Sequence, residues 1–385
     1  MLKKYYMDHA ATSFPKAPNV ASAMTEYIEG VGASINRGAY TEAYAAENKV
    51  YETRELICQL FGTSKAENVV FTKNITESLN LLLKALLKSG DHVIVSAIEH
   101  NAVMRPLNWL RDNCGISYDV LPCDSKGHLI LDQLEPLIQS HTKLVLMTHA
   151  SNVSGTILDL KAVGKICHEK NIFFAMDTAQ TAGILDIKAE RYHADAIAFT
   201  GHKGLLGPQG IGGILLSDSI LTAMDSFIQG GTGSLSEMET QPDYMPDRFE
   251  SGTQNLPGIY GLHAALKYLL AKPPLTIRDH ELLLTRAFMY GISQMSHVFC
   301  VGPDRAEEKM AVCSIVFKDR DQGEVAYLLD KEFGIMTRCG LHCAPSAHKT
   351  LGTFPEGTVR FSFGYHHTLE DIYYALDAIE KIALL

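Results

Sequence analysis

The chain has 385 residues, of which 46% are hydrophobic and 20% are charged, an ordinary globular composition whose length predicts about two domains. The net charge of −10 argues against a nucleic-acid partner, because no basic stripe is present to neutralise phosphates. The start of the chain has no signal-peptide core and no run of about 18 apolar residues predicts a membrane span, so the eight cysteines are expected to be reduced thiols of a cytoplasmic protein.

Short apolar runs alternate with helical patterns from about residue 66 onward. Strands are expected at 68–72, 92–96, 116–122, 143–150, 172–177, 195–200 and 212–217. Helices are expected at 76–89, with Thr76 as its cap and Gly90 as its stop, at 100–113 and at 159–169. This alternation indicates an α/β fold with a mostly parallel seven-stranded sheet and helices on both faces.

The pattern changes near residue 218. Residues 218–257 are polar and rich in glycine and proline, which favours a functional loop. Helices are then expected at 258–271, 276–295, 323–334 and 368–385, with strands at 298–302, 311–317 and 358–364. This part predicts a second, smaller α+β domain.

Polar residues follow several of the expected strands, where the ligands of open α/β sheets bind. Asp177 comes after five apolar residues and is either a paired buried carboxylate or a helix cap. His100 ends another strand. The segment KNITES (73–78) starts a helix, and its backbone N–H groups with the hydroxyls of Thr76 and Ser78 suit a phosphate. Lys203 follows a strand and lies in a glycine-rich loop, which argues against a solvated lysine.

Together these residues predict a pyridoxal phosphate site. That cofactor needs a lysine for a Schiff base, an anion at its ring nitrogen, a phosphate cradle and a ring that stacks on its face. Lys203, Asp177, Thr76 and His100 are the candidates, and the glycines beside Lys203 would let the backbone pass close to the cofactor. A nucleotide site is excluded, because GPQGIGG (207–213) is not GxGxxG and no GxxxxGK[ST] occurs.

The chain resembles the class V aminotransferase-fold pyridoxal phosphate enzymes, which have fold-type I, and among them the cysteine desulfurases and selenocysteine lyases. The resemblance rests on segments in family order over essentially the whole chain: YMDHAATSFP (6–15), INRGAY (35–40), FTKNITESLN (71–80), SAIEHNA (96–102), HASNVSGTI (149–157), MDTAQTAG (176–183), FTGHKGLLGPQGIGGILL (199–216), RFESGTQN (248–255), RCGLHCAP (338–345) and GTVRFSFGYHHTLEDI (357–372). It implies a large cofactor domain at 14–257 and a small domain at 258–385, on which segment 1–13 packs.

The resemblance also implies roles for individual residues. Lys203 would carry the Schiff base, Asp177 would contact the ring nitrogen, and His100 would stack on the ring. Further cofactor contacts are implied for Asn152, Gln180, Thr76, the Ile75 backbone, Thr200, His202 and, across a homodimer with shared sites, Thr253. Arg360, with Asn152 and Arg338 near it, would bind the substrate carboxylate, for which a guanidinium is well shaped.

Cys343 stands at the family's position for a nucleophilic cysteine. The implied reaction converts L-cysteine to alanine: Lys203 takes the Cα proton, and the Cys343 thiolate attacks the substrate sulfur and becomes a persulfide. Arg338 and His342 are expected to favour the thiolate by positive charge. Two alternatives stay open for this segment, namely a zinc site of Cys339, His342, Cys343 and His348, and loop thiols without a role. Cys339 departs from the family pattern and is a candidate resolving thiol.

Other departures qualify the resemblance. Tyr40 stands where some desulfurases carry histidine, and Ile75 leaves only a backbone contact to phosphate. The short loop after Cys343 resembles the group with a fixed cysteine loop, which suits an acceptor protein or an external thiol as sulfur sink. Alternatives to the desulfurase are a selenocysteine lyase, a cysteine sulfinate lyase, a class V aminotransferase or a non-catalytic scaffold. No resident metal, nucleic acid or membrane is expected.

Overall fold

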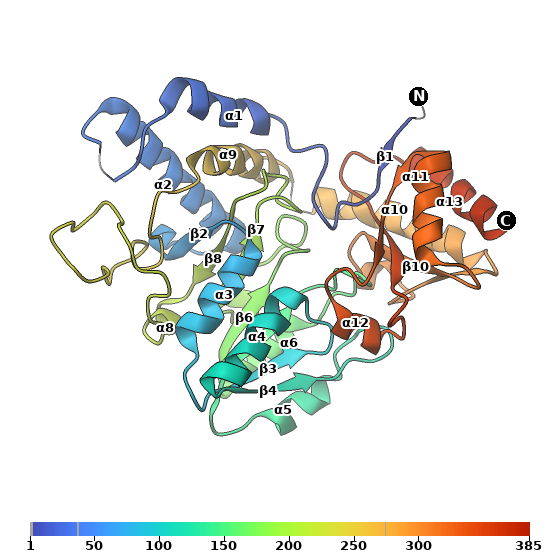
Figure 1. The fold of residues 1–385 in the computed structure, drawn as a ribbon, viewed down its shortest axis with the longest axis horizontal. Coiled ribbons are helices and arrows are strands. Elements are labelled where there is room, and N and C mark those ends of the chain that lie inside the picture. The colour runs from blue at the N-terminus through green and yellow to red at the C-terminus, as the bar shows by residue number, and fades with distance from the viewer. Residues whose placement is uncertain (1–2, 37, 274) are drawn as a thin grey trace.

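A seven-stranded sheet forms the centre of the molecule (Figure 1), in a computed structural model that describes residues 3–36, 38–273 and 275–385. The strand order is β2-β8-β7-β6-β5-β3-β4, and only the pairings of β8 with β2 and β7 are antiparallel. Its strands are β2 (Val69–Thr72), β3 (His92–Ser96), β4 (Ser117–Leu121), β5 (Thr142–Thr148), β6 (Phe173–Asp177), β7 (Ala196–Thr200) and β8 (Gly212–Leu216). The predicted mostly parallel seven-stranded α/β sheet is confirmed.

Helices cover both faces of this sheet, because alternate strand residues point to opposite sides. Val69, Val145 and Phe199 pack into a cluster with α2 (Thr41–Phe61), α6 (Leu160–Glu169) and α9 (Leu256–Leu270). Val70 and Leu144 pack on the other face with α3 (Ile75–Leu86) and α4 (Asn101–Cys114). The other helices of this part are α1 (Val20–Glu26), η1 (Tyr27–Val31), η2 (Ala66–Asn68), η3 (Leu131–Gln133), α5 (Leu134–Leu137), α7 (Ala189–Tyr192) and α8 (Asp218–Leu221).

A second, four-stranded antiparallel sheet lies in the C-terminal part, with strand order β12-β13-β10-β9. Its core is separate from the two clusters of the large sheet. The elements are β9 (Val298–Cys300), β10 (Val312–Phe317), β11 (Ile335–Met336), β12 (Arg338–Gly340), β13 (Thr358–Ser362), α10 (Thr276–Ser293), η4 (Ala306–Glu308), α11 (Gln322–Phe333), α12 (Pro345–Thr350) and α13 (Leu369–Ala383). The N-terminal segment joins this part, since β1 (Tyr5–Tyr6) pairs with β11.

Two expectations about helices need correction. Helix α3 begins at Ile75 and ends at Leu86, and its cap is Asn74, whose side chain accepts a hydrogen bond from the Glu77 amide, so Thr76 lies inside the first turn. Helix α9 packs against α1 and α2 on the large sheet (Figure 1). The division of the chain into two domains stays a prediction, and we propose that its boundary follows α9 rather than residue 257.

No helix in the described residues has both the length and the apolarity that a membrane span requires.

Candidate active site

The carboxyl ends of two adjacent parallel strands place the central residues. Asp177 is the last residue of β6, and β7, paired beside it, ends at Thr200. Lys203 follows in the turn between β7 and β8. The lysine and the carboxylate are near enough for each charge to act on the other, as expected from neighbouring strand ends.

Asp177 is a buried acid with one free oxygen. Its side chain is almost fully buried, and its Oδ1 accepts a hydrogen bond of 2.8 Å from the Ala179 amide. Burial raises the pKa of this carboxyl, while the Ala179 hydrogen bond and the Lys203 charge oppose the rise. Within the described residues the second oxygen has no hydrogen-bond partner. It is therefore available to a cationic group placed above the strand end.

The surroundings of Lys203 make its amine easier to deprotonate than an ordinary lysine. Burial lowers the pKa of its ammonium from 10.5 to about 8, with Arg360 and Arg338 acting in the same direction and Asp177 and Asp8 against it. The nearby glycines also have a packing role that the sequence did not predict. A Cβ on Gly204 would lie 2.5 Å from the Ala182 carbonyl oxygen, and one on Gly201 2.9 Å from that of Ile211. These glycines let the loop of Lys203 pack closely against neighbouring backbone carbonyl groups.

His100 caps α4 and faces the same cluster of charges. Its Nδ1 accepts a hydrogen bond of 3.0 Å from the Ala102 amide, so the neutral ring carries its proton on Nε2. Burial, together with the charges of Lys203 and Arg338, lowers the pKa of the ring to about 4. His100 is therefore a neutral ring beside Lys203 at physiological pH.

The expected phosphate groups fall into two sets. Thr200 Oγ1 and His202 Nδ1 are buried and have no hydrogen-bond partner among the described residues. Burial lowers the pKa of His202 to about 4. Thr76 is exposed in the first turn of α3, next to buried Ile75. The hydroxyl of Ser78 is instead turned inward, where it lies 2.8 Å from Thr72 Oγ1 and is not free for a ligand.

Two amide side chains hold loops rather than point into open space. Asn152 donates a hydrogen bond of 2.8 Å to the carbonyl of His342, and Gln180 donates one of 3.2 Å to the carbonyl of Ala10. Both residues are half-buried. They connect the strand ends of the large sheet with the N-terminal segment and with the loop that carries Cys343.

Arg360 is a buried guanidinium fixed at two points. It lies on β13, its Nη2 donates to Asp8 Oδ1 at 2.7 Å, and its Nη1 donates to the carbonyl of Asn152 at 3.0 Å. Its Nε is buried without a partner. Burial lowers the pKa of the group, and Asp8 opposes this. Arg338 is exposed on β12, directly opposite Arg360 in the strand pairing.

Cys343 lies in a short loop between β12 and α12. Cys343 is exposed and has a left-handed backbone, with φ 59°. The preceding His342 also has a left-handed backbone, with φ 48°. The carbonyl of Cys343 accepts a hydrogen bond of 2.8 Å from the Asn101 amide at the start of α4. With the bond from Asn152 to His342, this ties both loop residues to the large sheet, as expected of a fixed loop.

The expectation that His342 supplies positive charge to Cys343 is wrong. The His342 ring is buried, and its Nε2 lies 2.9 Å from Thr358 Oγ1. Burial, with the charges of Arg360, His348 and Arg338, lowers the pKa of the ring to about 2, so it is neutral. In the described residues, Cys339, His342, Cys343 and His348 also form no group of three ligand atoms within 4.8 Å of one another, so no geometry here supports the zinc alternative.

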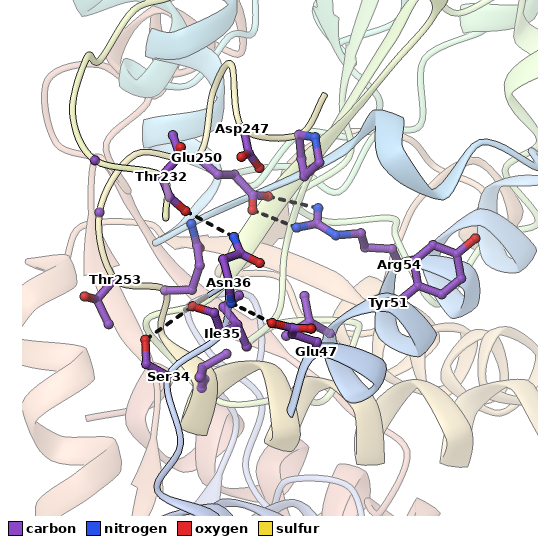
Figure 2. Close-up of a pocket in the computed structure, with 16 residues that line it drawn as sticks. Ser34, Ile35, Asn36, Glu47, Tyr51, Arg54, Thr232, Asp247, Glu250 and Thr253 are labelled. Atoms are coloured by element: carbon purple, nitrogen blue, oxygen red, sulfur yellow. Dashed lines mark hydrogen bonds and ion pairs between the residues drawn. The ribbon is translucent and has the colours of Figure 1, made fainter. Parts of the chain in front are cut away.

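Thr253 lies apart from these residues. It is exposed after the polar loop and lines a pocket with Asn36, Thr232 and Glu250 (Figure 2), whereas Lys203 lines a separate cavity. In this pocket Arg54 of α2 binds both oxygens of Glu250 at 2.9 and 2.7 Å (Figure 2). Tyr40, a departure from the family pattern, is exposed beside α2.

Three further residues belong to the site, and sequence reasoning assigned them no role. Asp8 is the anion of Arg360, and Lys16 donates a hydrogen bond of 3.1 Å to the carbonyl of His202. Glu99 is fully buried, and its Oε1 accepts a hydrogen bond from the Thr148 amide at 2.8 Å. Burial raises the pKa of Glu99 to about 8. The signal for Asp8 was its place in the segment YMDHAATSFP, an acid beside apolar and small residues.

Comparisons with known proteins identify one family. Residues 5–374 match the sequence profile of Aminotransferase class-V. A probable cysteine desulfurase of Methanothermobacter thermautotrophicus is 34% identical over 98% of this chain and 94% of its own length. One from Pyrococcus abyssi is 32% identical over 98% of this chain and 94% of its own length. The apo structure of cysteine desulfurase from Thermococcus onnurineus NA1 superposes with a TM-score of 0.93 at 32% identity, over 99% of this chain and 95% of that one.

Proposed function

Since this chain belongs to the class V aminotransferase family and, within it, to the cysteine desulfurases, we propose that it takes sulfur from L-cysteine and releases L-alanine. The sulfur is held on Cys343 as a persulfide. The observation that carries the proposal is one charge cluster of Lys203, Asp177 and Arg360. The loop of Cys343 is bonded to Asn152, whose carbonyl also binds Arg360.

The class V family depends on pyridoxal phosphate, and the residues present fit that group. Thr200 Oγ1 and His202 Nδ1 are buried polar atoms without a partner, and they lie at the same strand end as Lys203. Among the described residues the Lys203 amine makes no hydrogen bond or ion pair. A free amine, a buried acid and unpaired hydrogen-bonding atoms are the set that an aldehyde, a ring nitrogen and a phosphate require.

We assign the cofactor contacts accordingly. Lys203 would bind its aldehyde, Asp177 its ring nitrogen, and His100 the face of its ring. The phosphate would lie against Thr200, His202, Thr76 and the Ile75 amide, and Gln180 and Asn152 would be near the ring oxygen. When bound, pyridoxal phosphate supplies an electron-withdrawing ring that stores the electron pair released at the substrate Cα.

The chain's own groups then perform three tasks. Arg360, kept in place by Asp8 and the Asn152 carbonyl, binds the substrate carboxylate. The Lys203 amine accepts the Cα proton, which its lowered pKa permits because a neutral fraction exists near pH 7. Cys343 as a thiolate attacks the substrate sulfur: the new S–S bond forms as the C–S bond breaks, and the carbon fragment takes up protons to become alanine.

The test compares two exposed thiols four residues apart. Holoenzyme is mixed with L-cysteine in the absence of a reducing thiol, and alanine and the mass of the Cys343 peptide are measured. We expect one alanine per site and a Cys343 peptide heavier by one sulfur atom. The variant Cys343→Ala should lose both, whereas Cys339→Ala should retain both. Full alanine and sulfide release from cysteine by Cys343→Ala would overturn the assignment, and parallel assays with selenocysteine and cysteine sulfinate separate the related lyases.

We further propose a cytoplasmic homodimer that passes its sulfur to an acceptor protein or an external thiol. The exposed Thr253, in a pocket separate from Lys203, supports an arrangement in which each subunit contributes Thr253 to the phosphate site of its partner. Mixing a Thr253→Ala chain with a Lys203→Ala chain tests this sharing. The mixed dimer then has one site lacking both residues and one intact site, so about half of the activity of that dimer should return although each parent is impaired.

A further inference from the structure

A buried lysine outside the active site has a thiol as its partner. Lys309 is fully buried, and its Nζ lies 3.7 Å from Cys300 Sγ and 3.3 Å from the carbonyl oxygen of Val301. Within the described residues no carboxylate forms an ion pair with it. Burying an ammonium without a counter-charge is costly, so the environment of this lysine calls for an anion.

Cys300 is placed to be that anion. It lies half-buried on the edge strand β9, next to strand β10, which carries the fully buried Cys313. Gly155 packs against Lys309, because a Cβ there would lie 3.3 Å from Lys309 Cε and 2.7 Å from the Val312 carbonyl oxygen. The lysine side chain is therefore confined next to Cys300 and has little freedom to reach solvent.

Other charged groups lie near this pair, and Arg278 donates a hydrogen bond of 2.7 Å to the backbone carbonyl of Lys309. Lys126 acts on Cys300 in the same direction as Lys309, and Asp304 acts on Lys309. Those two residues bind each other at 2.5 Å on the surface, where their effect is screened. The neighbouring Cys313 and the Lys309 charge lower the pKa of Cys300 although burial opposes them. Burial alone would lower the pKa of Lys309, but the two thiols raise it. Both directions favour a thiolate–ammonium pair.

We propose that Cys300 is a second nucleophilic thiolate of this protein, distinct from Cys343, and a site of modification by hydroperoxides. In the reaction Cys300 Sγ attacks the outer oxygen of the hydroperoxide, so that an S–O bond forms as the O–O bond breaks. The sulfur is oxidised to a sulfenic acid, and the peroxide is reduced to a hydroxide or alkoxide that takes a proton from water. Lys309 stabilises the thiolate that reacts and loses its counter-charge afterwards.

The first test measures the reactivity of each cysteine in the native holoenzyme. Short pulses of iodoacetamide between about pH 5 and pH 9.5, followed by peptide mass spectrometry, give a labelling rate for Cys300 and for Cys114, a comparator that is also half-exposed. An ordinary thiol near pKa 8.5 is a few per cent thiolate at pH 7. We expect the Cys300 midpoint to lie at least about one unit lower and its rate at pH 7 to be at least about fivefold that of Cys114. A Cys300 midpoint at or above that of an ordinary thiol would overturn the proposal.

The second test removes the cation. Lys309→Met should raise the Cys300 midpoint and abolish trapping of its sulfenic acid by a 1,3-dione after hydrogen peroxide treatment, while Lys309→Arg should retain both properties. If Lys309→Met does not fold, the Cys300 midpoint is measured in Lys126→Met and in the wild type, and trapping of the sulfenic acid is measured in Cys300→Ser. Lys126→Met should move the midpoint only slightly, and Cys300→Ser should remove the trapped peptide without loss of alanine formation. Equal reactivity of Cys300 with and without the Lys309 charge contradicts the assignment.

Discussion

Lys203 should react as a neutral amine near neutral pH when the cofactor is absent. Burial and two guanidinium groups lower its pKa from 10.5 to about 8. A shift of about 2.5 units corresponds to about 3.4 kcal/mol in favour of the neutral form. At pH 7 about one amine in ten is then neutral, against about one in three thousand for an unshifted lysine, so the reactive fraction of Lys203 is roughly 300-fold larger.

The assay is reductive methylation of the apoenzyme with formaldehyde and cyanoborohydride, followed by quantification of the Lys203 peptide. The rate should rise with pH, reach half its maximum near pH 8 and then level off, whereas surface lysines continue to gain reactivity. Asp177→Asn should move the midpoint to lower pH, because the Asp177 charge raises the pKa of Lys203. Arg360→Gln should move it to higher pH, because the Arg360 charge lowers that pKa.

Opposite shifts are the decisive feature. Asp186→Asn, a change in an exposed acid paired with Arg191, serves as the control and should leave the midpoint in place. A wild-type midpoint above about pH 10 would refute the argument that burial neutralises this lysine. Shifts of the same sign in Asp177→Asn and Arg360→Gln would refute the placement of both charges around it.

Three further predictions concern stability. Arg54→Met leaves the buried Glu250 carboxylate without its cation and should lower the free energy of unfolding, measured in urea, by about 3–5 kcal/mol. Arg111→Met, at an exposed ion pair, should lower it by less than about 1 kcal/mol. Equal losses in the two variants would contradict this prediction. Burial lowers the pKa values of His9, His149 and His342 to about 2, 3 and 2, so below about pH 6.5 the unfolded state binds protons first. As the pH falls, each of these residues should lower the free energy of unfolding by about 1.4 kcal/mol per pH unit. A free energy of unfolding that stays constant between pH 6.5 and pH 5 would refute this prediction. Gly204→Ala should destabilise by about 1–3 kcal/mol in the same assay, because its Cβ would meet the Ala182 carbonyl oxygen, while Gly30→Ala, with open space around it, should have little effect.

The sequence predicted the large sheet well because the signal is local. Most of the buried strands are short apolar runs that end in a polar residue, as β6 ends at Asp177 and β7 at Thr200, shortly before Lys203. The strand-end rule then placed these residues together without knowledge of the strand order. The reversed direction of β8 was outside this reasoning, since periodicity does not report the direction of a strand.

The remaining features depend on contacts between distant parts of the chain. Asp8 and Arg360 are 352 positions apart, and no local pattern couples them. The neutrality of His342 follows from its burial against Thr358 and from the charges around it, so a count of basic residues near Cys343 overstated the positive charge there. The cap of α3 was misplaced by two residues, because both Asn74 and Thr76 are acceptable caps and only the backbone decides between them.

The pairing of Asp8 with Arg360 divides the work of the site between segments of the chain. Lys203 and Asp177 belong to the continuous block that builds the large sheet, since Asp177 ends β6 and Lys203 follows β7, its neighbour. The pair of Asp8 and Arg360 instead joins positions near the two ends of the chain. Contacts between distant positions tend to form late, because closing a long loop costs the chain conformational entropy. We therefore expect the strand ends that carry Lys203 and Asp177 to come together in folding before Asp8 meets Arg360.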